Sequence, residues 1–258
     1  MKIIAVIPAR FASTRFPGKP LALLQGHPII WWVVRRARDV EGIQDIYVAT
    51  DNWDIANAAR DAGAQPLMPV GEFASGTDRI AAAIHEIKAD VVVNIQGDEP
   101  MIERETIRRT LNAVLADQQT HVGSACVKIF DQSDYLSPNV VKVVRDRFDY
   151  ALYFSRSPIP NLARAPQGGL VNYGRSCEGE PALFYGWKHI GLYIYRRHVL
   201  DEFVALSPTL LEDTEKLEQM RLLENGYRIK VVETPFDSQG VDTPEDLAEL
   251  NARLTPAQ

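Results

Sequence analysis

The sequence has only two cysteines in 258 residues and no apolar run long enough to cross a membrane. Spanning a bilayer takes about 20 consecutive apolar residues. Cys126 lies in an apolar run and Cys177 in a polar stretch, which does not indicate a disulfide framework. The N-terminus enters a strand pattern directly, without the pattern of a signal peptide. We therefore expect a protein of the reducing cytoplasm that does not insert into membranes.

A net positive charge is also absent. The chain carries 28 Lys and Arg against 34 Asp and Glu, which gives a formal net charge of −6. Nonspecific nucleic-acid binding needs a basic face, so we expect no nucleic-acid partner. Local groups of cations must then serve a particular small anion.

Apolar runs alternate with amphipathic stretches along the chain, without repeats or low-complexity tracts. This alternation predicts a single α/β domain over residues 1–254, with a Rossmann-like, mostly parallel central sheet and helices on both faces. The pattern changes at residue 131, and a small antiparallel extension is expected over roughly residues 131–195. The expected strands cover residues 3–7, 43–50, 64–68, 90–96, 122–129, 139–144, 151–154, 188–195 and 229–233, and the expected helices residues 27–40, 55–62, 77–87, 102–115, 215–225 and a last one from about 243.

The loop after the first strand carries three cations, Arg10, Arg15 and Lys19. In open α/β sheets ligands bind beyond the carboxyl ends of the strands, and Gly18 allows the backbone to approach a ligand closely. The loop therefore indicates a site for a polyanion such as a nucleoside triphosphate. The alternative is three solvated cations on an ordinary connection. The loop has no Gly-x-Gly-x-x-Gly motif, which argues against a dinucleotide-binding oxidoreductase.

A second signal follows the buried strand at residues 90–96, which ends in Gly97-Asp98-Glu99-Pro100. A carboxylate at this position is costly to desolvate unless a cation compensates, and a divalent cation with oxygen ligands meets that need. We expect Asp98 to be a metal ligand, with a capping role as the alternative. Glu99 precedes a proline, is restricted to extended geometry and is expected to serve the turn.

Weaker signals lie elsewhere in the chain. Ser75 and Gly76 could offer backbone groups to a base or ribose, with Arg79 reaching a phosphate or sugar; alternatively, Thr77 simply caps the next helix. Arg156 follows a strand end, which makes it a candidate for a bidentate contact with a carboxylate.

For two further residues, His189 and Asp242, spacing alone does not indicate a functional role. Spacing favours no role for His189, and capping of the last helix by Asp242 or Thr243 is sufficient to explain Asp242 unless it faces Asp98. The polar, aperiodic residues 161–185 are expected to form a functional flap or a disordered segment.

Together and in this order, these motifs resemble those of nucleotidyltransferases that activate acidic sugars with CTP, and in particular the 3-deoxy-manno-octulosonate (Kdo) cytidylyltransferase family. The resemblance extends from residue 2 to about residue 250. It is carried by residues 7–10, 13–20, 75–79, 94–100, 139–144, 150–156, 189–191, 217–219 and 240–246.

The resemblance implies a cytoplasmic, magnesium-dependent homodimer that makes CMP-Kdo and pyrophosphate from CTP and Kdo for lipopolysaccharide synthesis. The extension at residues 131–195 would serve the dimer and the sugar site. By this resemblance the catalytic residues are Arg10, Lys19, Asp98 and Asp242, and the two aspartates bind Mg²⁺. The resemblance implies that the nucleotide is bound by Arg10, Arg15, Lys19, Ser75, Gly76 and Arg79. It implies that the sugar is bound by Gln96, Arg156, His189, Tyr193, Glu218 and Gln219.

Two features depart from the family pattern, the glycine-rich stretch at residues 161–185 and the pair Trp187-Lys188 before His189. Both lie near the expected sugar site, so the same reaction on a close analogue, such as an 8-amino sugar, is the first alternative. The second is a noncatalytic sugar-nucleotide-binding protein. Such a protein could dispense with Asp98 and Asp242, and both are present.

Overall fold

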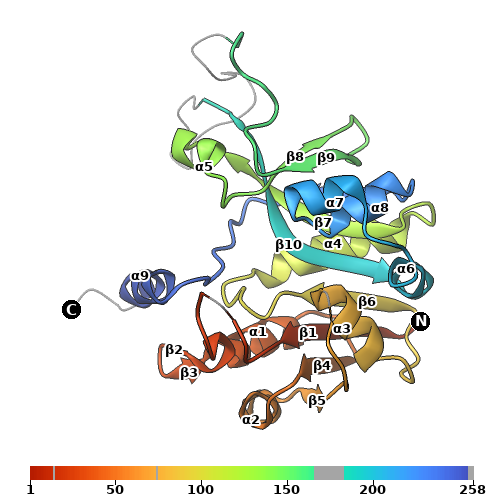
Figure 1. Ribbon diagram of the computed structural model, residues 1–258, viewed down its shortest axis with the longest axis vertical. Coiled ribbons are helices and arrows are strands. Elements are labelled where there is room, and N and C mark those ends of the chain that lie inside the picture. The colour runs from red at the N-terminus through yellow and green to blue at the C-terminus, as the bar shows by residue number, and fades with distance from the viewer. Residues whose placement is uncertain (14, 74, 166–182, 255–258) are drawn as a thin grey trace.

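The structure is a computed structural model that describes residues 1–13, 15–73, 75–165 and 183–254 (Figure 1). Within these residues one nine-stranded sheet has the order β11-β7-β10-β6-β1-β4-β5, and β8 and β9 extend it beside β10. A small separate hairpin pairs β2 (Leu23–Leu24) with β3 (His27–Pro28). The strands of the large sheet are β1 (Ile3–Ala9), β4 (Asp45–Thr50), β5 (Gln65–Leu67), β6 (Val91–Ile95), β7 (Val122–Ile129), β8 (Lys142–Arg145), β9 (Ala151–Ser155), β10 (Gly186–Arg196) and β11 (Ile229–Glu233).

Most strands of this sheet point in the same direction, although half of the pairings between neighbours are antiparallel. β1 pairs with β4 and β6 in parallel, and β11 pairs with β7 in parallel. The long β10 runs antiparallel to β6, β7 and β8, and β8 pairs antiparallel with β9. The predicted mostly parallel sheet with an antiparallel extension is therefore confirmed.

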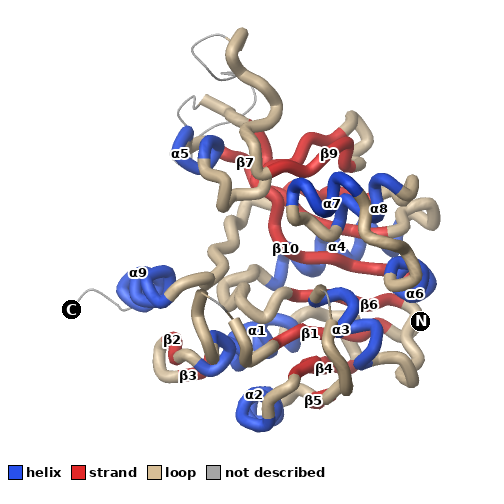
Figure 2. Tube along the Cα trace, viewed as in Figure 1, coloured by secondary structure: helices blue, strands red, loops and turns tan. Residues whose placement is uncertain are grey.

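Helices cover both faces of the sheet (Figure 2). Along β1 the side chains alternate, so that Ile3, Ala5 and Ile7 pack in one core and Ile4 and Val6 in the other. The first core contains residues of α1 (Ile29–Arg38), α2 (Trp53–Ala62) and α4 (Arg104–Ala116), and the second those of α3 (Gly76–Ala83), α6 (Arg197–Phe203) and α8 (Gln219–Glu224). The remaining helices are η1 (Lys19–Leu21), α5 (Gln132–Leu136), α7 (Leu210–Glu215) and α9 (Pro244–Leu254).

Three local predictions were wrong. The helix expected from residue 27 begins at Ile29, because His27 and Pro28 form β3 and pair with β2. Ser75, not Thr77, caps α3, because its Oγ accepts a hydrogen bond from the Asp78 amide at 3.1 Å and the helix already begins at Gly76. The single helix expected over residues 215–225 is two helices. Lys216 adopts a left-handed conformation with φ of 55° and ends α7 before α8 begins. An apolar pattern carries no signal for such a break.

Part of the expected flap at residues 161–185 falls on residues 166–182, which lie outside the described residues, as does Cys177. In the part of the chain that the structure describes, none of the helices has the length and apolar character needed to cross a membrane. Cys126 is buried in β7, and burial raises the pKa of its thiol to about 12.

Candidate active site

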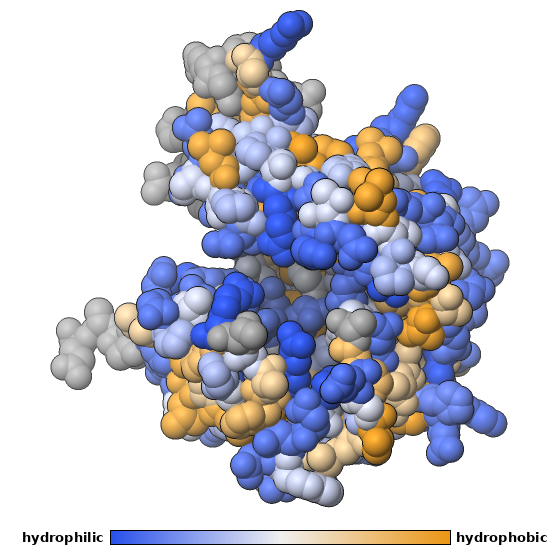
Figure 3. Space-filling view, in the orientation of Figure 1, coloured by the Kyte–Doolittle hydropathy of each residue, from blue (hydrophilic) through white to orange (hydrophobic). Residues whose placement is uncertain are grey.

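A cleft of about 480 Å³ opens where β1 and β6 end. Figure 3 shows it as a hollow between the part of the molecule with β1 and the part with α7, rimmed by hydrophilic side chains. Ten of the expected site residues line this cleft: Arg10, Arg15, Lys19, Ser75, Gly76, Arg79, Gln96, Asp98, Glu218 and Asp242. Arg156, His189, Tyr193 and Gln219 are not part of its lining.

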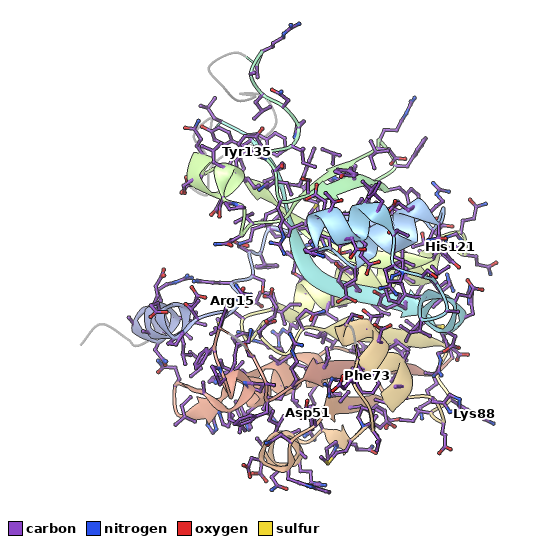
Figure 4. All side chains as sticks on the ribbon, in the orientation of Figure 1. Arg15, Asp51, Phe73, Lys88, His121 and Tyr135 are labelled. Carbon is purple, nitrogen blue, oxygen red and sulfur yellow. The ribbon has the colours of Figure 1, made fainter. Side chains whose placement is uncertain are left out.

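Lys19 occupies the centre of the charged end of the cleft. Its ammonium nitrogen lies 2.6 Å from Oδ2 of Asp98 and 3.2 Å from Oδ1 of Asp242. The Lys19 side chain is 13% exposed. Gly18, with φ of 71°, turns the chain into η1 and so directs Lys19 toward the two carboxylates. Arg15 adds a second cation, 3.1 Å from the same oxygen of Asp242 (Figure 4).

The structure also decides between the two readings of Asp242. Thr243 caps α9, because its Oγ1 accepts a hydrogen bond from the Asp246 amide at 3.2 Å. The Val241 amide donates to the carbonyl of Asp98 at 2.9 Å, which brings the two segments together. The carboxylate of Asp242 therefore faces Asp98 and is not needed as a helix cap.

The donor set of this pair fits a divalent cation. Two carboxylates already share one ammonium group, so they are close enough to share a metal ion. Hard cations such as Mg²⁺ prefer oxygen ligands and usually keep water or substrate phosphates as further ligands. Among the described residues no group of three or more His, Cys, Asp or Glu side chains could hold a metal. Asp98 and Asp242 would therefore bind Mg²⁺ together with phosphates, not in an all-protein cage.

Arg79 forms another wall of the cleft. Its Nη2 donates to Oδ2 of Asp51 at 3.1 Å, and its guanidinium lies 5.2 Å from the centre of the Phe73 ring (Figure 4). Its Nη1 is buried and has no hydrogen-bond partner among the described residues. Buried donors are normally paired, so this nitrogen is available to an acceptor on a ligand.

Three more polar atoms in this region lack partners. They are Nδ2 of Asn94, Oε2 of Glu218 and Nε2 of Gln219, all buried and unpaired within the described residues. Tyr193 pairs with Asn94 in register, so the two side chains share one face of the sheet with Gln96. Hydroxyl groups of a sugar can both donate and accept, and they would satisfy atoms of both kinds.

His189 and Tyr193 lie on β10 within 5.5 Å of each other, measured between ring centres. Nε2 of His189 is hydrogen-bonded to Oγ of Ser124 at 2.8 Å. Burial lowers the pKa of His189 to about 3 and raises the pKa of Tyr193 well above its ordinary value. Both side chains are therefore neutral near pH 7, and neither is suited to be a general base.

Arg156 is fixed by main-chain oxygens. Its Nε donates to the carbonyl of Glu215 at 3.2 Å and its Nη1 to the carbonyl of Pro138 at 3.1 Å. The carboxylate of Glu215 accepts a hydrogen bond from the Arg156 amide at 3.0 Å. The bidentate site predicted at Arg156 stays a prediction.

The sequence did not predict the wall of the cleft formed by Glu212, Asp213 and Lys216. These residues lie around the break between α7 and α8. The sequence has no motif that marks them. Asn94 could have been found, because it is a polar residue in an otherwise apolar strand. Of the two departures from the family pattern, Trp187 and Lys188 have local partners: Trp187 donates to Glu233 and Lys188 pairs with Asp237.

Comparisons with known proteins identify the family of the chain. A family model for cytidylyltransferases matches residues 4–229. The 3-deoxy-manno-octulosonate cytidylyltransferase of Geotalea daltonii is 46% identical, with 98% of each chain covered. The enzyme of the same name from Geobacter metallireducens is also 46% identical, with 100% of each chain covered.

A solved structure also matches the fold of this chain. A CMP:2-keto-3-deoxy-manno-octonic acid synthetase complexed with CTP superimposes with a TM-score of 0.85 at 37% identity, and the match covers 98% of both chains. Sequence, family model and fold thus give the same result over nearly the whole length. The chain belongs to the 3-deoxy-manno-octulosonate cytidylyltransferase family.

Proposed function

We propose that this protein transfers a cytidylyl group from CTP to Kdo, giving CMP-Kdo and pyrophosphate for lipopolysaccharide synthesis. One observation carries the chemical part of the proposal: Asp98 and Asp242 share the ammonium group of Lys19 in a cleft that Arg10 and Arg15 also line. Its relatives with about 46% identity bear the name of this activity.

In this reaction the anomeric hydroxyl of the sugar attacks the α-phosphorus of CTP, a new P–O bond forms, and the bond to pyrophosphate breaks. Positioning and charge stabilisation account for most of the catalysis of such transfers. Arg10, Arg15 and Lys19 bind the triphosphate and balance the charge of the leaving pyrophosphate. Mg²⁺, held by Asp98 and Asp242, would supply further charge neutralisation at the phosphates.

The remaining residues orient the two substrates. Ser75 and Gly76 present the N-terminus of α3 to the nucleotide, and Arg79 offers its unpaired Nη1 to it. Around the sugar, Gln96, Glu218 and Gln219 supply hydrogen bonds, and the unpaired atoms of the last two support this role. Arg156 is the cation for the sugar carboxylate, while His189 and Tyr193 act as neutral hydrogen-bonding groups.

The proposal includes a homodimer in the cytoplasm, formed through the extension at residues 131–195. In support, β9 has β8 as its partner in the described sheet and carries Leu152 with 62% of its surface exposed; Phe148 nearby is 61% exposed. An open edge strand with apolar side chains is suited to pairing with a second copy. Analytical ultracentrifugation should give the mass of a dimer, and Leu152→Lys should shift the equilibrium toward monomer.

Pyrophosphate release from CTP tests the activity directly. The purified protein is given CTP and Mg²⁺ with Kdo, with its 8-amino analogue or with another acidic sugar. Release with Kdo that stops when EDTA removes the metal is the expected result. Release with none of the sugars would overturn the proposal, and release with the 8-amino analogue alone would replace the substrate.

A further inference from the structure

The two aspartates of the cation site sit on very different elements. Asp98 directly follows β6, which is buried in the middle of the sheet. Asp242 lies on residues 234–243, here called the connecting segment, which joins β11 to α9 without regular secondary structure (Figure 1). Asp98 lies in the short turn that follows a paired strand, whereas the position of Asp242 depends on the contacts that hold the connecting segment.

Three contacts join the middle of the connecting segment to β10 and to the turn after β6. Asp237 forms an ion pair of 2.9 Å with Lys188 on β10. The Val241 amide donates to the carbonyl of Asp98. Between these two points the hydroxyl of Ser238, a residue only 5% exposed, donates a hydrogen bond to Oε2 of Glu99.

Glu99 lies where three parts of the chain meet. A Cβ atom at Gly240 would lie 3.5 Å from its Oε1, and one at Gly191 would lie 3.8 Å from it. The carboxylate therefore lies between β10 and the connecting segment, close to the main chain of both. Burial raises the pKa of Glu99 to about 7, with the charge of Asp98 as a lesser cause.

The turn at residues 96–99 does not explain this side chain. The main chain closes the turn, with the Glu99 amide donating to the carbonyl of Gln96 at 3.2 Å. Placing a second carboxylate in a partly buried position beside Asp98 costs free energy. Its presence there therefore indicates a function beyond the turn. The observed partner, Ser238, lies on the segment that carries Asp242.

We propose that Glu99 is a positioning residue: through Ser238 it holds the connecting segment so that Asp242 faces Asp98 and both carboxylates share one cation. The inference rests on the proposed function, because it assumes that this cation site binds a metal. A small displacement of one of two ligands weakens metal binding strongly, since ligand sites depend on groups held within about 0.5 Å.

Binding of Mn²⁺, measured by the EPR signal of the free ion in the presence of CTP and without sugar, tests the inference. The variants are Ser238→Ala, Glu99→Gln and Glu99→Ala. We expect Glu99→Ala to weaken Mn²⁺ binding about tenfold or more, in line with other residues that orient metal ligands. Ser238→Ala should weaken it severalfold, and Glu99→Gln less, because its amide oxygen still accepts from Ser238.

The kinetics should show the same order. The Mg²⁺ concentration for half-maximal turnover should rise in the variants, while kcat at saturating Mg²⁺ changes little. Tyr227→Phe is the matched control. It removes another hydroxyl–carboxylate bond, from Tyr227 to Glu202 at 2.6 Å, beside His121 and far from Arg15 (Figure 4). It should leave Mn²⁺ binding unchanged.

Because Glu99→Ala removes a partly buried side chain, Ser238→Ala and Glu99→Gln decide the outcome. Wild-type Mn²⁺ affinity in both of them would overturn the positioning role. A different result separates the two proposals: if the wild-type protein itself binds no Mn²⁺ with CTP and releases no pyrophosphate, the proposed function fails, and the inference fails with it.

Discussion

The ammonium nitrogen of Lys19 lies 2.6 Å from Oδ2 of Asp98, and the same nitrogen is 3.2 Å from Asp242. Lys19 thus occupies the place between two carboxylates that a divalent cation needs. Two unit charges about 4 Å apart interact with roughly 4 kcal/mol at an effective dielectric constant of about 20. Under the proposed function, Lys19 and a metal ion would therefore compete for the aspartates until a triphosphate gives the ammonium group another partner.

This competition predicts that Lys19→Met binds metal more tightly than the wild type when no nucleotide is present. An increase of about tenfold in Mn²⁺ affinity corresponds to about 1.4 kcal/mol, well within the repulsion that is removed. The KM for CTP should rise at the same time, because the triphosphate loses a cation. Mn²⁺ EPR without CTP measures the first effect and initial rates measure the second.

Lys88→Met is the control, because Lys88 is exposed and remote from the cleft (Figure 4). It should change neither the Mn²⁺ affinity nor the KM for CTP. Equal or weaker Mn²⁺ binding by Lys19→Met would contradict the competition.

Asp98→Asn should lower kcat about 10²-fold or more and leave the fold intact. Asparagine keeps the shape of the side chain but removes the negative charge that holds the cation. Circular dichroism and a thermal melt check the fold, and pyrophosphate release measures turnover. Asp54→Asn, an exposed change of the same kind in the first turn of α2, serves as the control. A folded Asp98→Asn protein with near-normal turnover would refute its assignment as a metal ligand.

The sequence predicted the elements whose signals are local. β7 and β11 have the predicted bounds, because each is a short segment rich in apolar and β-branched residues. The position of β10 between β6 and β7 did not follow from the sequence, since strand order depends on pairing between residues far apart in the chain. The break at Lys216 was missed for another reason: a single left-handed residue leaves the apolar pattern of a helix intact.

The same distinction between local signals and long-range contacts applies to the residues of the site. Arg10, Lys19 and Asp98 were predicted from the residues alone, because each follows a central strand at its carboxyl end. Asp242 was assigned by resemblance, and its facing of Asp98 depends on the fold of the connecting segment. Glu99 was expected to serve only the turn. Its main chain does so, but no pattern in the sequence could show that its side chain reaches Ser238.

His189 should make stability depend on pH. Its pKa in the folded protein is about 3, below the ordinary 6.5, so between these values the unfolded chain binds a proton that the folded one does not. The contribution of the neutral His189 to the free energy of unfolding is complete above pH 6.5. Below that pH the contribution falls by about 1.4 kcal/mol for each pH unit. From pH 7.5 to pH 5 the wild type should therefore lose about 2 kcal/mol more than His189→Gln, as urea unfolding at both pH values can show. The same loss in both proteins would contradict the assignment.

Lys142 should be essential for stability, although it is remote from the charged end of the cleft. Its side chain is fully buried, and its ammonium group donates to the carbonyls of Ser137, Val140 and Arg156 at 2.8, 2.7 and 2.5 Å. Burial desolvates this ammonium group and so lowers its pKa.

Lys142→Met keeps most of the apolar stem but leaves three carbonyl groups without their donor. A buried group without a partner costs roughly 1–3 kcal/mol, and local relaxation recovers part of it, so the free energy of unfolding should fall by about 2–4 kcal/mol. The KM for the sugar should rise more than that for CTP, because the main chain of Arg156 loses an anchor. Urea unfolding and initial rates measure the two effects. Lys2→Met, which breaks a surface ion pair with Asp45, should lower the free energy of unfolding far less, because solvent screens this pair. An unchanged unfolding midpoint for Lys142→Met would show that the three hydrogen bonds contribute little.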